Sequence, residues 1–144
     1  MGQIEELDVA IRTLMRVLVI DERRLSSRLH AEPFNPIDLE TLSYLQRHPG
    51  VPAKDIATFL GVRATTMQSV IDRLQKRGLV DRDCGVLKGR AVALTLTAAG
   101  VMFREQMHDQ NLANCTQMLG AIAQSERADF VKNMTKIAAG IKAV

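Results

Sequence analysis

The spacing of apolar residues predicts long amphipathic helices at both ends of the chain. Near the N-terminus, apolar residues recur every three or four positions, which places one apolar stripe along a helix. The C-terminal third shows the same spacing twice, and Ser125 is the expected N-cap of the last helix. Such stripes can pack on their own domain or on a second copy, and the pattern does not choose between the two. The stripes are Ile4, Leu7, Ile11, Leu14, Leu18, Leu25 and Leu29, then Leu112, Cys115, Leu119 and Ile122, then Phe130, Met134, Ile137 and Ile141.

Three short helices are predicted between these ends. Over residues 35–47, Asn35 suits the N-cap, Pro36 suits the first helical position, and Leu39, Leu42 and Leu45 supply a buried face. A second helix is expected over 52–60, followed by a turn at Gly61. A third is expected over 64–77 and stops at Gly78. Its apolar face consists of Met67, Val70, Ile71 and Leu74.

After Gly78 the hydrophobic period changes to two. Val92, Leu94 and Leu96 alternate with smaller or polar residues, which predicts a β-strand, and Leu79 and Val80 are its expected partner. The intervening residues 81–89 contain two glycines and predict the tip of a hairpin. Thr97 is expected to cap the following helix. The predicted order is therefore one helix, three short helices, a hairpin and two helices.

Length and composition exclude several classes of protein. A chain of 144 residues, 47% hydrophobic and 24% charged, is expected to fold as one soluble domain. Two cysteines are too few for a disulfide scaffold, and the acidic N-terminus resembles no signal peptide, so a cytoplasmic protein without a membrane partner is expected. No nucleophile elbow, phosphate loop or metal-ligand spacing occurs, so we expect neither an enzyme nor a metal site nor any other cofactor.

The positive charge is concentrated in one segment. Residues 61–95 carry seven basic and three acidic side chains, a net charge of +4 within a chain whose net charge is +3. A charge cluster alone is more often a solvated surface, but this one coincides with the predicted third helix and hairpin, which favours a polyanionic partner. The basic residues are Arg63, Arg73, Lys76, Arg77, Arg82, Lys88 and Arg90.

The third helix presents a polar face opposite its apolar stripe. At 100° per residue, Thr65, Ser69, Asp72 and Lys76 lie on that face, with Thr66, Gln68 and Arg73 on its flanks. Such short polar side chains can reach base edges in a major groove, although an ordinary exposed helix face would also be polar. Lys88 and Arg90 on the hairpin suit the minor groove. A helix-turn-helix followed by a basic hairpin predicts a winged helix that binds double-stranded DNA.

Three motifs carry a family resemblance. DIATFLGV at 55–62, VIDRLQKRGLVDR at 70–82 and LTAAG at 96–100 resemble the MarR family of transcriptional regulators, and the resemblance extends over nearly the whole chain. It implies a mainly α fold with a small β-hairpin: a winged helix-turn-helix DNA-binding lobe at 35–97, and a dimerisation region formed by helices of 1–32 and 98–144. It also implies a homodimeric repressor on a palindromic operator, released by a small aromatic or phenolic effector or by an oxidant.

The resemblance assigns roles to individual positions. Thr65, Thr66, Gln68 and Ser69 would face bases or adjacent phosphates, Arg73 the DNA backbone, and Arg90 the minor groove. Two positions depart from the family pattern. Lys88-Gly89-Arg90 replaces the usual Asp-x-Arg of the wing, and Arg63 replaces a small N-capping residue, so a phosphate contact by Arg63 and stronger phosphate attraction by Lys88 are expected, with Lys76 adding to the basic surface.

The switch that would control DNA binding is left open by the sequence. His30 and His108 are candidates for contact with an effector, although a buried or interfacial histidine is the commoner role of His108. Cys84 in the hairpin offers an alternative, redox-switched regulator. Cys115 lies on an apolar stripe and is expected in the core. A winged helix used only for protein contacts is a further alternative, disfavoured by the localised basic charge.

Overall fold

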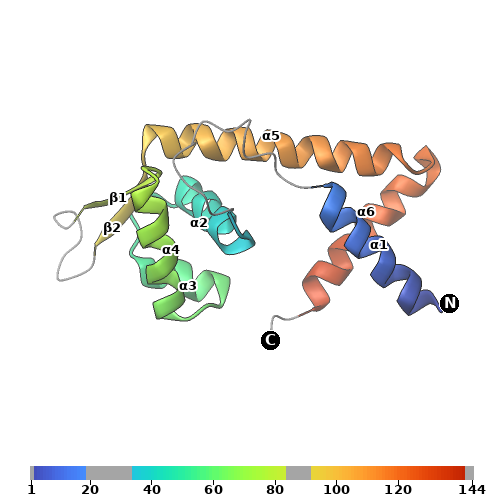
Figure 1. The fold of residues 1–144 in the computed structure, drawn as a ribbon, viewed down its shortest axis with the longest axis horizontal. Coiled ribbons are helices and arrows are strands. Elements are labelled where there is room, and N and C mark those ends of the chain that lie inside the picture. The colour runs from blue at the N-terminus through green and yellow to red at the C-terminus, as the bar shows by residue number, and fades with distance from the viewer. Residues whose placement is uncertain (1, 19–33, 84–91, 142–144) are drawn as a thin grey trace.

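The computed structural model describes residues 2–18, 34–83 and 92–141. The elements follow the order α1 (Gln3–Val17), α2 (Pro36–Arg47), α3 (Ala53–Leu60), α4 (Ala64–Lys76), β1 (Val80–Asp83), β2 (Ala93–Leu96), α5 (Ala98–Gly120) and α6 (Gln124–Gly140). Figure 1 shows α2, α3, α4 and the two strands gathered at one end of the long helix α5, and α1 and α6 at its other end. The mainly helical winged-helix fold is thus confirmed.

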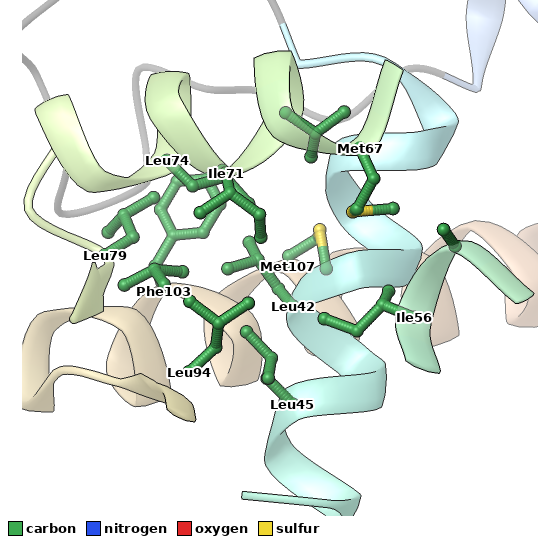
Figure 2. Packing of buried hydrophobic residues seen from close by; sticks show 13 residues of the cluster. Leu42, Leu45, Ile56, Met67, Ile71, Leu74, Leu79, Leu94, Phe103 and Met107 are labelled. Atoms are coloured by element: carbon green, nitrogen blue, oxygen red, sulfur yellow. The ribbon is translucent and has the colours of Figure 1, made fainter. Parts of the chain in front are cut away.

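One hydrophobic core holds the lobe at the first end of α5. Leu42 and Leu45 of α2, Ile56 of α3 and the whole predicted stripe of α4 are buried. Phe103 and Met107 of α5 point into the same cluster, so the start of α5 belongs to this core by packing (Figure 2). Residues 34–83 and 92–107, which contain this core, form the lobe.

Local sequence signals explain where the short helices begin and end. The Asn35 side chain accepts a hydrogen bond from the Asp38 amide at 2.9 Å, and the Asp38 carboxylate accepts one from the Asn35 amide at 3.2 Å. This capping box, with Pro36 in the first turn, confirms the predicted start of α2. Gly61 has a φ of 68°, in the left-handed region that glycine tolerates, and forms the turn between α3 and α4.

The wing is a small antiparallel sheet anchored to the turn before α3. β1 pairs with β2 in a register that places Val80 opposite Leu96 and Arg82 opposite Leu94. Val51 adds an isolated bridge to Leu94, whose amide donates to the Val51 carbonyl at 2.9 Å. Leu79, predicted to be a strand residue, precedes β1, whereas the strand continues beyond Val80 to Asp83.

A close backbone approach joins α5 to the turn between α4 and β1. The Thr97 hydroxyl caps α5 by accepting from the Gly100 amide at 2.9 Å, and it donates to the Gly78 carbonyl at 2.6 Å. A Cβ on Gly100 would lie 2.1 Å from the Leu79 carbonyl oxygen. The Leu-Thr-x-x-Gly motif therefore fixes the start of α5 against the turn between α4 and β1.

The terminal helices differ from the lobe, because neither α1 nor α6 contains a buried residue.

Two sequence predictions are wrong in the C-terminal part of the chain. α6 begins after Ala123, which makes no side-chain cap, so Ser125 lies inside the first turn. Cys115 is exposed rather than packed in the core, because α5 extends beyond the lobe at this point. None of the helices in the described residues is long and apolar enough to cross a membrane.

Candidate nucleic-acid interface

The polar face of α4 is directed outward by the apolar face beneath it. Met67 and Ile71 have no exposed surface, whereas Thr65, Ser69 and Lys76, on the opposite side of the helix, are exposed. Thr66 and Gln68 on the flanks are also exposed. The Ser69 hydroxyl donates to the Thr65 carbonyl at 3.3 Å, which leaves its lone pairs available as acceptors. The structure therefore brings these predicted contact residues together on one surface.

The N-terminus of α4 carries a cation in place of a cap. Arg63 occupies the N-cap position, makes no side-chain capping hydrogen bond and is exposed. The Arg63 side chain therefore accepts no hydrogen bond from the first amides of the helix, and its positive charge lies at the helix N-terminus. Such a helix start suits an anion such as a phosphate. The predicted phosphate contact of Arg63 stays a prediction.

Arg73 is held by a carboxylate inside the lobe. Its guanidinium forms an ion pair with Asp38 of α2, whose side chain is 4% exposed, whereas that of Arg73 is 38% exposed. The other oxygen of Asp38 accepts the Asn35 amide in the capping box, so the buried carboxylate is satisfied on both sides. Burial of a carboxylate requires such partners. Arg73 therefore braces α4 against α2, and its predicted contact with the DNA backbone would come from its exposed edge.

A second ion pair involves Asp72 on the outward face of α4. Arg82 of β1 donates to the Asp72 carboxylate at 2.5 Å. Gln68, one turn before Asp72, lies beside Arg82 at the rim of a hollow of about 290 Å³ between α3, α4 and the wing. Arg82 belongs to the basic cluster that favours a polyanionic partner, but its guanidinium is directed at α4. Asp72 and Arg82 were not predicted to interact.

Arg77 also has a role that the sequence did not reveal. It ends α4 as the C-cap residue, and its guanidinium lies 3.2 Å from the centre of the Phe34 ring. The Phe34 ring in turn packs on Phe103 of α5, with 4.5 Å between ring centres. Cation–π contact of this kind anchors the end of α4 to the core. Arg77 thus contributes to the packing of the lobe as well as to its charge.

The remaining predicted positions are placed only in part. Lys88, Arg90 and Cys84 of the wing, and His30, lie outside the described residues. His108 is exposed on α5, away from the core. Among residues 2–18, 34–83 and 92–141 no group of three or more His, Cys, Asp or Glu side chains could hold a metal ion.

Asp38, which pairs with Arg73 of α4, was not singled out by the sequence. The spacing Asn35-x-x-Asp38 at a predicted helix start is a capping-box pattern, which was a usable signal for its position. Its partner Arg73 is 35 residues away in the sequence, and nothing local to either residue indicates the pair.

Comparisons with known proteins agree with this geometry. A family model described as the MarR family matches residues 33–86. The HTH-type transcriptional repressor Rv2887 of Mycobacterium tuberculosis is 25% identical over 96 residues, which cover 67% of this chain and 69% of the relative. The crystal structure of YusO from Bacillus subtilis superposes with a TM-score of 0.73 at 19% identity, over 94% of this chain and 92% of YusO. PcaV from Streptomyces coelicolor, crystallised with its natural ligand, has a TM-score of 0.65 at 22% identity, over 96% and 91% of the two chains.

Proposed function

We propose that the chain, whose residues 33–86 match the MarR family model, is a winged-helix repressor that binds a palindromic DNA operator as a homodimer and is released by a small molecule. The observation that carries the proposal is the exposed polar face of α4, which the core of the lobe holds outward beside the wing. A helix of about 10–12 Å diameter fits a major groove about 12 Å wide.

The role proposed for each residue at the DNA interface, base contact or phosphate contact, follows from its side-chain chemistry. Thr65, Thr66, Gln68 and Ser69 can donate to or accept from base edges, and they supply sequence preference. Arg63 and Lys76 make no ion pair with any described residue, so their charges are available to phosphates at the two ends of α4. Arg73 reaches the backbone through its exposed part, and Lys88 and Arg90 extend the contact from the wing.

The homodimer is supported by the apolar side chains that α1 and α6 leave exposed. Apolar side chains on both helices are exposed in the single chain, from Leu14 at 40% to Ile4 at 82% on α1, with Met134 at 47% and Ile137 at 52% on α6. An apolar surface of this kind on exposed helices is typical of a protein–protein interface. A second copy would bury it and would set two lobes about one helical turn of DNA, roughly 34–36 Å, apart.

Repression and release by an effector are supported by the relatives. Rv2887 is named a transcriptional repressor, and PcaV was crystallised with its natural ligand. A small aromatic or phenolic molecule that prefers the conformation unable to bind DNA would shift the population away from the operator.

The test begins with selection of duplexes from a random DNA library at moderate salt, with the mass of the complex measured in parallel. We expect a palindrome bound by two chains. Lys76→Ala should weaken binding to all sequences and reduce the salt dependence by about one phosphate contact. Gln68→Ala should change base preference at a cost of about 1–3 kcal/mol for the selected operator.

Exposed Thr135→Ala on α6 is the matched control for these variants, and it should leave both affinity and preference unchanged. Recovery of no preferred sequence, or of a complex containing one chain, would contradict the proposal. Binding to a protein partner without any affinity for DNA would favour a protein-interaction module instead.

A further inference from the structure

Asp72 lies on the outward face of α4, and its neighbour Arg73 lies on one flank of that face. Successive residues of a helix are 100° apart, so adjacent side chains diverge around the axis. Arg73 pairs with Asp38 of α2, and Asp72 pairs with Arg82 of β1. α4 is therefore held by two ion pairs of opposite polarity. The Arg73 side anchors it to the core, and the Asp72 side connects it to the wing.

Strand geometry explains why Arg82 points at α4. Alternate residues of a strand face the same way, and Arg82 shares its face with Val80, which is 1% exposed. Asp81 and Asp83 belong to the other face of β1 and are exposed. The side chain of Arg82 is 31% exposed, and it is directed to the α4 side of the wing. In β1, the cation thus faces α4 and both acidic residues face away from it.

The position of Asp72 makes this contact important for an interface with DNA. Asp72 lies on the same side of α4 as Ser69, three residues earlier, and Lys76, four residues later, and its carboxylate is 56% exposed. A negative charge at this position would repel the phosphates that flank a major groove. The guanidinium of Arg82, 2.5 Å away, counters that charge.

We propose that Arg82 is a positioning residue of the DNA interface, which holds the wing against α4 through Asp72 and neutralises that carboxylate, without contacting a phosphate itself. This inference rests on the proposed DNA-binding function. It assigns the pair a role that neither residue would have alone, since Asp72 opposes DNA binding unless Arg82 is present.

A double-mutant cycle tests the proposal on the full-length protein. Arg82→Gln, Asp72→Asn and the double variant are compared with the unmodified protein for operator affinity at several salt concentrations. We expect Arg82→Gln to weaken binding by about tenfold, because the carboxylate is then uncompensated. Asp72→Asn should change affinity by less than about threefold, and in the double variant affinity should return to that of Asp72→Asn. The slope of affinity against salt should stay the same in all four proteins.

Two outcomes would overturn the proposal that Arg82 is a positioning residue. If the loss caused by Arg82→Gln persists in the double variant and the salt slope falls by about one contact, Arg82 binds a phosphate directly. If Asp72→Asn weakens binding more than Arg82→Gln does, the carboxylate itself reads the DNA. Arg12→Gln is the matched control, since it removes the same charge from an exposed ion pair with Asp8 on α1, outside the lobe. It should leave affinity unchanged.

A DNA-independent measurement separates this inference from the proposed function. If the unmodified protein binds no duplex, the proposed function fails, and hydrogen exchange of the β1 amides then decides whether Arg82 holds the wing. Faster exchange in both Arg82→Gln and Asp72→Asn, with unchanged exchange in α2, would support that role. Equal exchange in all variants would refute it. Exchange in the core of the lobe also shows whether each variant is folded.

Discussion

The lobe and the terminal helices use the same hydrophobic period in different ways. In α4, the residues at helical spacing, Met67, Val70, Ile71 and Leu74, are all at most 2% exposed. In α1, the residues at the same spacing are 40–82% exposed, and α6 likewise buries none of its residues. The lobe completes its own core, whereas α1 and α6 expose their apolar residues. Figure 1 shows these two helices at the end of α5 that is distant from the lobe.

The difference shows that an apolar stripe predicts a helix but does not predict what covers it. Leu42, Ile71 and Phe103 come from three helices and pack against one another inside the lobe (Figure 2). α1 and α6 have no comparable layer in the single chain. Burial of apolar area is the main favourable term in folding and association alike, so the surface left on the terminal helices is available for association.

The strongest contrast is predicted for an isoleucine-to-glutamate substitution made once in each region. Ile137→Glu on α6 should weaken self-association by about a hundredfold or more, because it removes an apolar side chain worth roughly 1.5–3 kcal/mol from each copy. The lobe should still unfold cooperatively. Ile71→Glu, in the core, should instead prevent the lobe from folding. Sedimentation reports association, and circular dichroism reports folding.

Thr135→Glu is the control, since residue 135 lies on the opposite side of α6 from residue 137 and is exposed. It should leave sedimentation unchanged. A dimer that survives Ile137→Glu but dissociates with Thr135→Glu would place the interface on the other face of α6.

A smaller effect is expected at the joint between the two regions. Gly100→Ala should destabilise the lobe by about 1–3 kcal/mol or more, because the added methyl group meets the Leu79 carbonyl oxygen and α5 must shift away. Chemical denaturation measures the change. Gly120→Ala in the same helix has no atom within 4 Å of its added Cβ and should be neutral or slightly stabilising. Equal effects at both glycines would show that the close approach at Gly100 has no energetic importance.

The smallest effect distinguishes the helix starts of the two regions. Asn35→Ala removes the capping box of α2 and should cost about 1 kcal/mol of stability. Ser125→Ala in α6 should change stability by less than about 0.5 kcal/mol, since Ser125 makes no cap. Both changes are measured by urea denaturation. A larger loss at Ser125 than at Asn35 would restore the predicted cap of α6.

Much of the fold was predictable because its signals are local. The bounds of α2, α3 and α4 agree with the predicted ones to within one residue, since Asn35, Pro36, Gly61 and Gly78 mark helix ends through backbone chemistry that involves only near neighbours. The outward face of α4 was also predictable, because helical periodicity places it opposite the apolar stripe. The start of α6 was less so, since Ser125 is a good capping residue beside a start at Gln124 that uses none.

Local patterns were enough to predict the types of the elements, the stripe that α4 buries and the polar face that α4 presents. The pairing of Arg73 with Asp38, the pairing of Arg82 with Asp72 and the exposure of Cys115 follow only from the folded chain. The two groups of features differ in the sequence distance over which the interactions act. Propensity, capping and periodicity act over a few residues, whereas an ion pair between two helices, or the end of a core along a long helix, depends on how distant segments pack together.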